Sequence, residues 1–169
     1  MKYFLPVLLI FCCPLFAHSQ DITGLWKGTM FNDSTKQTLQ YEVYISKQKG
    51  KYTGISHTWF LINDVKYYGI KKIKVHIAKD GKIILQDAEL IENNYPAAES
   101  RNVSQLNVLD LQNKENEAVL DGLFVTNRTH EYNQLTGHIN IKRVSLLSDS
   151  DLGRYLQKNG LENSMTVKK

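Results

Sequence analysis

The feature of this sequence that most constrains its fold is a series of eight short segments in which apolar and polar residues alternate. Alternation with a period of two is typical of strands with one buried face, because successive side chains point to opposite sides of a sheet. Turn residues separate the segments, and no convincing helical pattern lies between them. The predicted strands cover residues 22–30, 39–46, 51–61, 67–78, 82–91, 103–111, 118–126 and 135–144.

Short turns between these strands predict an antiparallel meander, which either closes into a barrel or splits into two packed layers. The strongest hairpin signal is Asp80-Gly81, which lies between two alternating runs. In the strand before it, Tyr68 and Ile70 lie on the opposite face from Ile73. A β-bulge near residues 71–72 would reconcile the two halves of that strand.

The N-terminus has the pattern of a cleaved signal peptide, predicted here over residues 1–19. Lys2 supplies a positive charge, residues 3–16 are almost wholly apolar, and Ala17-His18-Ser19 places small residues where a signal peptidase requires them. The apolar run is too short to remain as a membrane-spanning helix. We therefore expect a secreted or periplasmic protein without an integral membrane segment after cleavage.

Both cysteines of the chain lie in this leader, so the mature chain has no thiol for a disulfide or a metal site. Acylation of Cys12 or Cys13 would instead give a lipoprotein. The bulky Phe11 disfavours this alternative, because lipoprotein processing requires small residues before the cysteine. The formal net charge of +4 is mild and dispersed, and it does not indicate nucleic-acid binding.

The C-terminal part of the chain changes character and predicts a short helix. Residues 148–151 supply N-cap oxygens and negative charge, and Leu152, Tyr155 and Leu156 then share one helical face. Asn159-Gly160 provides a stop signal. So short a helix requires a packing partner, and we expect the outer wall of the sheet. The predicted division of the chain is 1–19 for the leader, 20–147 for the β domain and 148–169 for the short helix and a disordered tail.

The opening strand resembles two families of the calycin group of barrels. Gly24-Leu25-Trp26 matches the Gly-x-Trp motif of lipocalins, and residues 22–26 resemble the start of avidins. Gly54-Ile55-Ser56 and the strand at 137–141 are also similar to segments of uncharacterised secreted bacterial proteins. The resemblance implies an all-β fold, an eight-stranded antiparallel up-and-down barrel with a short C-terminal helix.

The same resemblance implies a structural floor at one end of the barrel. In lipocalins the motif tryptophan packs beneath a basic side chain of the last strand, and Trp26 and Arg143 match those positions. A cation–π contact between them would add to the burial of the ring. Biotin binding does not carry over from avidins, because Gly28 leaves the first strand without its polar contact. No cofactor is expected.

Five side chains are the candidate ligand-binding residues. They face one way along the second and third strands, where they either line a pocket or fill the barrel. The first reading is a non-enzymatic secreted module that binds a small apolar or amphipathic ligand. The alternative is a structural or protein-interaction module with a filled barrel, which meets another protein of the bacterial envelope. The candidates are Tyr41, Tyr52, Ser56, Thr58 and Phe60.

If the barrel is hollow, strand alternation predicts which end is open. Starting from Trp26 at the floor, the turn at 63–64 and the connections at 92–101 and 127–133 all lie at the opposite end. Aromatic residues flank these connections, with Trp59 expected at the rim and Tyr95 in the loop. They would form either a binding mouth or a lid over a filled core.

No residue pattern indicates an enzyme or a metal site. Asp87 and Glu89 share one face by parity, and we favour a solvated pair of carboxylates over an acid–base pair. Nucleophile-elbow, phosphate-loop and zinc-protease motifs are absent from the sequence. The four histidines that follow the leader lack the spacing of zinc ligands, and we expect them at the surface or in turns. They are His57, His76, His130 and His138.

Overall fold

The computed structural model describes residues 21–114 and 117–161. The predicted signal peptide lies outside the described residues, and so do Cys12 and Cys13, the sites of the alternative acylation. The tail predicted to be disordered from Leu161 onwards also lies outside them, except for Leu161 itself. None of the helices within the described ranges is long and apolar enough to cross a membrane.

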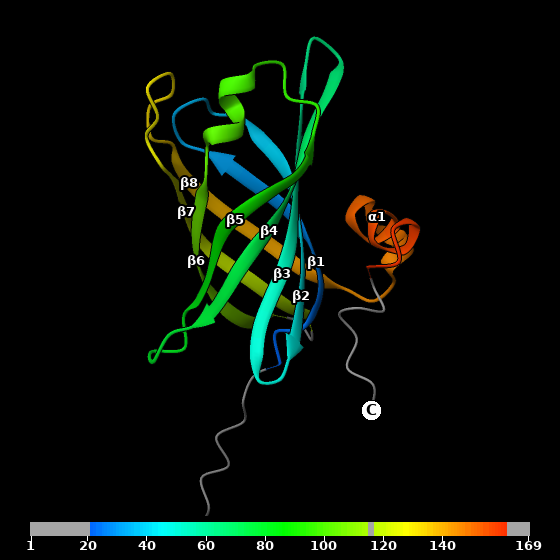
Figure 1. The fold of residues 1–169 in the computed structure, drawn as a ribbon. Coiled ribbons are helices and arrows are strands. Elements are labelled where there is room, and N and C mark those ends of the chain that lie inside the picture. The colour runs from blue at the N-terminus through cyan, green and yellow to red at the C-terminus, as the bar shows by residue number, and fades with distance from the viewer. Residues whose placement is uncertain (1–20, 115–116, 162–169) are drawn as a thin grey trace, which may run out of the picture.

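Eight antiparallel strands form a closed up-and-down barrel in chain order (Figure 1), which confirms the expected all-β fold. The first and last strands close the ring, with Trp26 paired to Arg143 and Gly28 to Ile141. Two 3-10 helices, η1 and η2, and the helix α1 complete the fold. The elements are β1 (Gly24–Asn32), β2 (Thr38–Gln48), β3 (Lys51–Ile62), β4 (Val65–Ile77), β5 (Ile83–Asn93), η1 (Ala98–Asn102), β6 (Gln105–Lys114), β7 (Glu117–Thr126), β8 (Thr136–Val144), η2 (Leu147–Asp149) and α1 (Asp151–Lys158).

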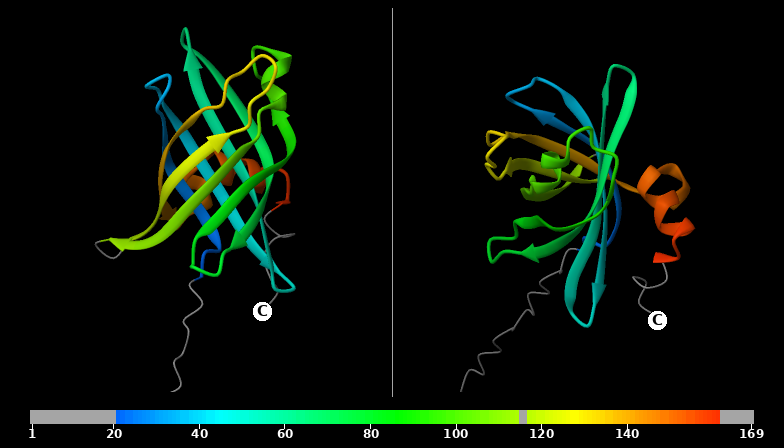
Figure 2. Two further views of the ribbon diagram at one scale, coloured as in Figure 1. Left: turned by 90° about the vertical axis from the view of Figure 1, so that its left-hand side faces the viewer. Right: turned by 45° about the horizontal axis from the view of Figure 1, so that its top comes forward.

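The two ends of the barrel carry different connections (Figures 1 and 2). The β1–β2 and β3–β4 turns, η1 and the β7–β8 loop lie at one end, which we call the mouth. The β2–β3 and β4–β5 hairpins lie at the other end, which we call the floor. The predicted placement of 63–64, 92–101 and 127–133 at one end is therefore confirmed.

The interior is filled with apolar side chains along most of its length. Trp26 from β1 is fully buried, and the strands around it contribute aliphatic residues whose exposure is close to zero. Towards the mouth the packing is less complete and leaves a cavity. The buried interior residues include Ile45, Ile73, Leu85, Leu109, Leu120, Ile139 and Ile141.

The irregularity predicted near residues 71–72 is present, but the extra residues lie on β5. Ile73 pairs with Asp87 and Lys72 with Glu89, so Ala88 bulges out of the ladder. A second shift follows between Ile70 and Lys71. The strand β4 therefore keeps its alternation, which turns Ile70 outwards. Ile70 is nevertheless buried, because an outer partner covers it.

That outer partner is α1, which packs against the wall of the barrel as expected (Figure 2). The Ser150 side chain caps the helix by accepting a hydrogen bond from the Gly153 amide at 2.9 Å. Leu152 and Leu156 are fully buried. They form an outer cluster with Leu25, Tyr44, Ile55 and Ile70.

Candidate functional site

A cavity of about 280 Å³ lies inside the barrel at its mouth. Most of its wall is aliphatic or aromatic and comes from β1, β2, β3, β7 and the loops above them. Polar groups are few and come chiefly from β3, β4, β6 and the mouth loops. The apolar lining consists of Met30, Leu39, Phe60, Tyr95, Val103, Phe124, Tyr132 and Leu135.

The structure places the five predicted ligand-binding residues at three different heights in the barrel. Thr58 and Phe60 line the mouth cavity. Tyr41 and Ser56 are buried below it, where the Tyr41 hydroxyl accepts a hydrogen bond from Asn107 at 2.9 Å. Tyr52 lies near the floor end, with the Lys47 ammonium 4.7 Å from its ring centre. Only two of the five therefore meet at one cavity.

A buried ion pair that the strand pattern does not predict adjoins the cavity. The Lys71 Nζ atom lies 2.6 Å from an Asp87 carboxylate oxygen and donates to the Val103 carbonyl at 2.7 Å. The Gln105 amide donates to the same Asp87 oxygen at 3.0 Å. The two charged side chains are only 16% and 8% exposed, respectively. The sequence does contain one signal for this ion pair. Lys71 lies between Gly69 and Ile73 at a position of β4 whose side chain faces the interior, where a lysine needs a charged partner.

This ion pair corrects the expectation for the two carboxylates on the fifth strand. Asp87 faces the interior, whereas Glu89 pairs with Lys72 on the outer wall and is 61% exposed. The extra residue Ala88 separates them and reverses the parity that the sequence suggests. The two carboxylates do not share a face, and only Glu89 is solvated.

Loops fold down over part of the opening. The Tyr95 ring packs onto the backbone of Gly69, where an added Cβ would overlap the tyrosine hydroxyl. Burial raises the pKa of Tyr95 to about 12. The hydroxyls of Ser100 and Tyr132 lie 3.1 Å apart and join η1 to the β7–β8 loop. Trp59 does not line the cavity; its ring faces the Lys66 ammonium at 4.3 Å.

At the other end of the barrel, the contact expected for Trp26 and Arg143 is present. The Arg143 guanidinium carbon lies 4.8 Å from the centre of the Trp26 ring. The indole nitrogen donates to the Ile22 carbonyl at 3.0 Å, and Arg143 also donates to the Asp21 carbonyl. These contacts hold the fully buried Trp26 ring in place at the floor.

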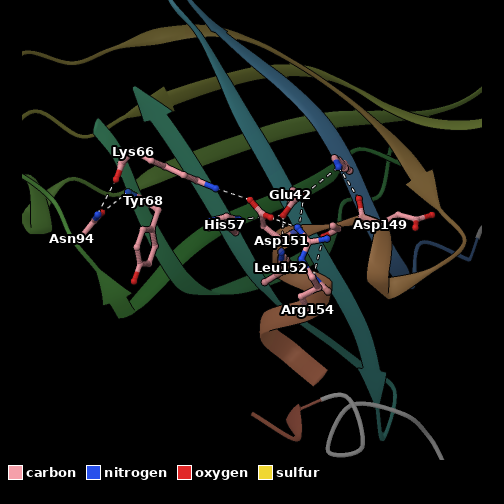
Figure 3. A network of polar contacts seen from close by, with 12 residues as sticks. Glu42, His57, Lys66, Tyr68, Asn94, Asp149, Asp151, Leu152 and Arg154 are labelled. Atoms are coloured by element: carbon pink, nitrogen blue, oxygen red, sulfur yellow. Dashed lines mark hydrogen bonds and ion pairs between the residues drawn. The ribbon is translucent and has the colours of Figure 1, made fainter. Parts of the chain in front are cut away.

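A second polar centre lies outside the barrel, beneath the start of α1 (Figure 3). The buried Glu42 carboxylate accepts hydrogen bonds from the Leu152 amide at 2.7 Å and the Asp151 amide at 3.3 Å. His57 Nδ1 lies 3.2 Å from the same carboxylate. Burial would raise the pKa of Glu42, but the hydrogen bonds from His57 and Leu152 outweigh it and lower that pKa.

His57 was expected at the surface because its side chain points away from the interior. The parity is correct, but α1 and Tyr68 cover the imidazole and bury it. His76, His130 and His138 are exposed, and His138 lies 3.1 Å from Asp121. Within the described ranges, no group of three or more histidine and acidic side chains is placed to hold a metal ion.

Comparisons of the chain with protein-family models, curated proteins and solved structures gave no significant match. The fold alone therefore defines the class, an eight-stranded antiparallel up-and-down β-barrel with a cavity at one end.

Proposed function

We propose that this protein is a non-enzymatic β-barrel module that binds a small apolar or amphipathic ligand in its mouth cavity. The observation that carries the proposal is the apolar cavity of about 280 Å³ at the end opposite Trp26. A concave, mostly apolar pocket with a few polar groups is typical of small-molecule sites. If each non-hydrogen atom takes roughly the 30 Å³ that water occupies in the liquid, the cavity holds about ten such atoms.

The chemistry of the wall supports a ligand that is largely apolar. Phe60, Phe124 and Leu39 offer rings and branched chains without polar groups, and Thr58 and Thr126 add small hydroxyls. Removal of apolar ligand surface from water at about 25 cal/mol per Å² would supply the main driving force. The half-buried Tyr95 and the more exposed Tyr132 at the opening would shield the bound ligand from solvent.

We also place the protein among calycin-type barrels secreted by bacteria. The opening motif, the leader-like N-terminus and the burial of Trp26 beneath Arg143 support this placement. Export to the periplasm or the medium is part of the proposal. Detection of a mature N-terminus at Gln20 by mass spectrometry would test it, whereas an acylated Cys12 or Cys13 would favour the lipoprotein alternative.

A second candidate is a protein-interaction module of the bacterial envelope. Leu123 and Val108 pair across β7 and β6 on the outer wall, where they are 64% and 40% exposed. Apolar side chains exposed on neighbouring strands are one property of partner-binding surfaces. In this reading the barrel is the scaffold, and the mouth cavity binds no ligand.

A titration with small apolar probes separates the two candidates. We expect 1-octanol to shift the amide NMR signals of Phe60, Phe124 and Thr126 and to leave those of the floor residues unchanged. Leu39→Trp fills the cavity and should abolish these shifts. Leu123→Trp is the matched control, since it adds the same ring to the outer wall. Absence of shifts at the mouth, or equal shifts in both variants, would contradict ligand binding there.

A further inference from the structure

We propose that the mouth cavity selects ligands with an uncharged polar head, such as a hydroxyl or a carbonyl group, and discriminates against carboxylates. This inference rests on the proposed function and names the ligand class of the same site. It follows from the position of Lys71 and from the neutralisation of its charge by Asp87.

Lys71 offers a ligand a charged hydrogen-bond donor. Among the described residues that line the cavity, Lys71 is the only one with a charged side chain. An ammonium carries three N–H donors, and Asp87 and the Val103 carbonyl account for two of them. The third donor remains for an acceptor atom at the end of a bound chain.

The charge of Lys71 is already balanced before any ligand enters. Its Nζ atom lies 2.6 Å from Asp87, and both side chains are largely removed from water. The pair is therefore close to neutral in a region where charges are weakly screened. An acceptor without charge gains the Lys71 hydrogen bond and leaves this balance unchanged.

A carboxylate at the same position would disturb that balance. It would set two anions around one ammonium and leave a net negative charge in the barrel, because no second cation lines the described wall. Burial of an unpaired charge is costly, and close like charges oppose each other by several kcal/mol. The carboxylate could bind well only if Asp87 were neutralised.

The alternative is a purely structural role, in which the ion pair only holds the irregular β4–β5 ladder in place. The pair does span the two strands beside the bulge at Ala88. If the pair has only a structural role, the ratio between neutral probes and the carboxylate does not depend on the charge of Asp87. A change of that ratio in Asp87→Asn therefore separates the two interpretations.

The test is calorimetric titration of the full mature chain with 1-octanol, octanamide and octanoate at pH 7.5. We expect both neutral probes to bind at least about tenfold more tightly than octanoate, the ratio that corresponds to about 1.4 kcal/mol. In Asp87→Asn, an isosteric change that leaves Lys71 uncompensated, the ratio should fall by about tenfold or reverse. Asp121→Asn, which removes an outer-wall carboxylate, should keep the wild-type ratio.

A measurement on the wild-type protein covers the case in which Asp87→Asn does not fold. Octanoic acid should bind at least about twofold more tightly at pH 5 than at pH 7.5, since roughly one sixth of a carboxyl with a pKa near 4.3 is neutral at the lower pH and almost none at the higher one. The binding of 1-octanol should stay constant over this range, which controls for changes in the protein.

The outcomes distinguish the inference from the function on which it rests. If no probe binds in any condition, the proposed ligand-binding function is wrong. If octanoate binds as tightly as 1-octanol to the wild type, or if its binding does not strengthen at pH 5, the function stands and the head-group selection is overturned. An unchanged ratio in a folded Asp87→Asn variant would also overturn it.

Discussion

The interior of the barrel and the outer cluster beneath α1 are both buried and apolar, but they depend on the chain in different ways. The interior receives side chains from strands all round the closed ring, whereas the outer cluster depends on a single eight-residue helix. Each region also buries a carboxylate beside a basic side chain, Asp87 with Lys71 inside and Glu42 with His57 outside. We infer that the interior opens only when the whole barrel unfolds, whereas the outer cluster can open locally by release of α1.

The largest effect should come from the floor of the interior. Trp26→Ala should lower the free energy of unfolding by about 3–5 kcal/mol, because it removes a fully buried ring and the Arg143 contact. Urea unfolding measures the change. The matched control is Trp59→Ala, whose half-buried outer ring should cost much less. A Trp26→Ala protein that melts within a few degrees of the wild type would show that the floor is not a stabilising centre.

A smaller and more local effect is expected under α1. Leu152→Ala should destabilise the docked helix by about 2–4 kcal/mol, within the usual range for buried leucines. Hydrogen exchange should show loss of protection in α1, while the amides of β6 and β7 remain protected. Leu146→Ala, at an exposed leucine, is the control. Equal loss of protection in the barrel strands would mean that the two regions unfold together.

Low pH should release α1 from the barrel wall, because protonation of Glu42 weakens its hydrogen bonds to the start of the helix. Because the pKa of Glu42 is lowered in the folded protein, its contribution to stability is fully present above the unfolded value of about 4.3 and is lost as the pH falls through the lower folded pKa. Exchange protection of Leu156 should therefore decrease below about pH 4. Glu42→Gln should weaken docking at neutral pH and remove this part of the pH dependence. Protection of Leu156 that follows pH equally in both proteins would contradict the role of Glu42.

The smallest effect on stability is expected at the mouth. Gly69→Ala should push the Tyr95 ring out of its place and cost about 1 kcal/mol or slightly more, because the loop can move to relieve the overlap. The pKa of Tyr95 should fall from about 12 towards the ordinary value near 10, as seen by NMR titration of the ring. If the pKa of Tyr95 stays near 12, the loop that carries Tyr95 has not moved and the prediction is wrong.

Much of the fold could be predicted from the sequence because alternation, turn residues and helix caps are local signals. The barrel order, the Trp26–Arg143 floor and the docking of α1 all follow from them or from the resemblance. The mouth site was harder to predict. Parity gives the face of a strand but not the height in a tilted barrel, so Tyr52 was grouped with residues that lie far above it.

Asp87 and His57 show why other features of the site could not be predicted. A one-residue bulge on β5 moved Asp87 to the interior, and single-sequence patterns do not locate such bulges reliably. His57 was placed on the correct face, but its burial depends on α1, which begins almost a hundred residues later. Long-range packing of this kind leaves no local mark in the sequence.

The pairing of β1 with β8 also sets the order in which the chain can fold. Trp26 finds its partner Arg143 only when the last strand has been made, so the ring stays open throughout synthesis of the strands between them. Contacts between such distant segments slow folding, and open strand edges attract other chains. β1 is therefore the first strand to be synthesised and among the last to complete its pairing. Until β8 pairs with it, the open edge of β1 needs protection from aggregation.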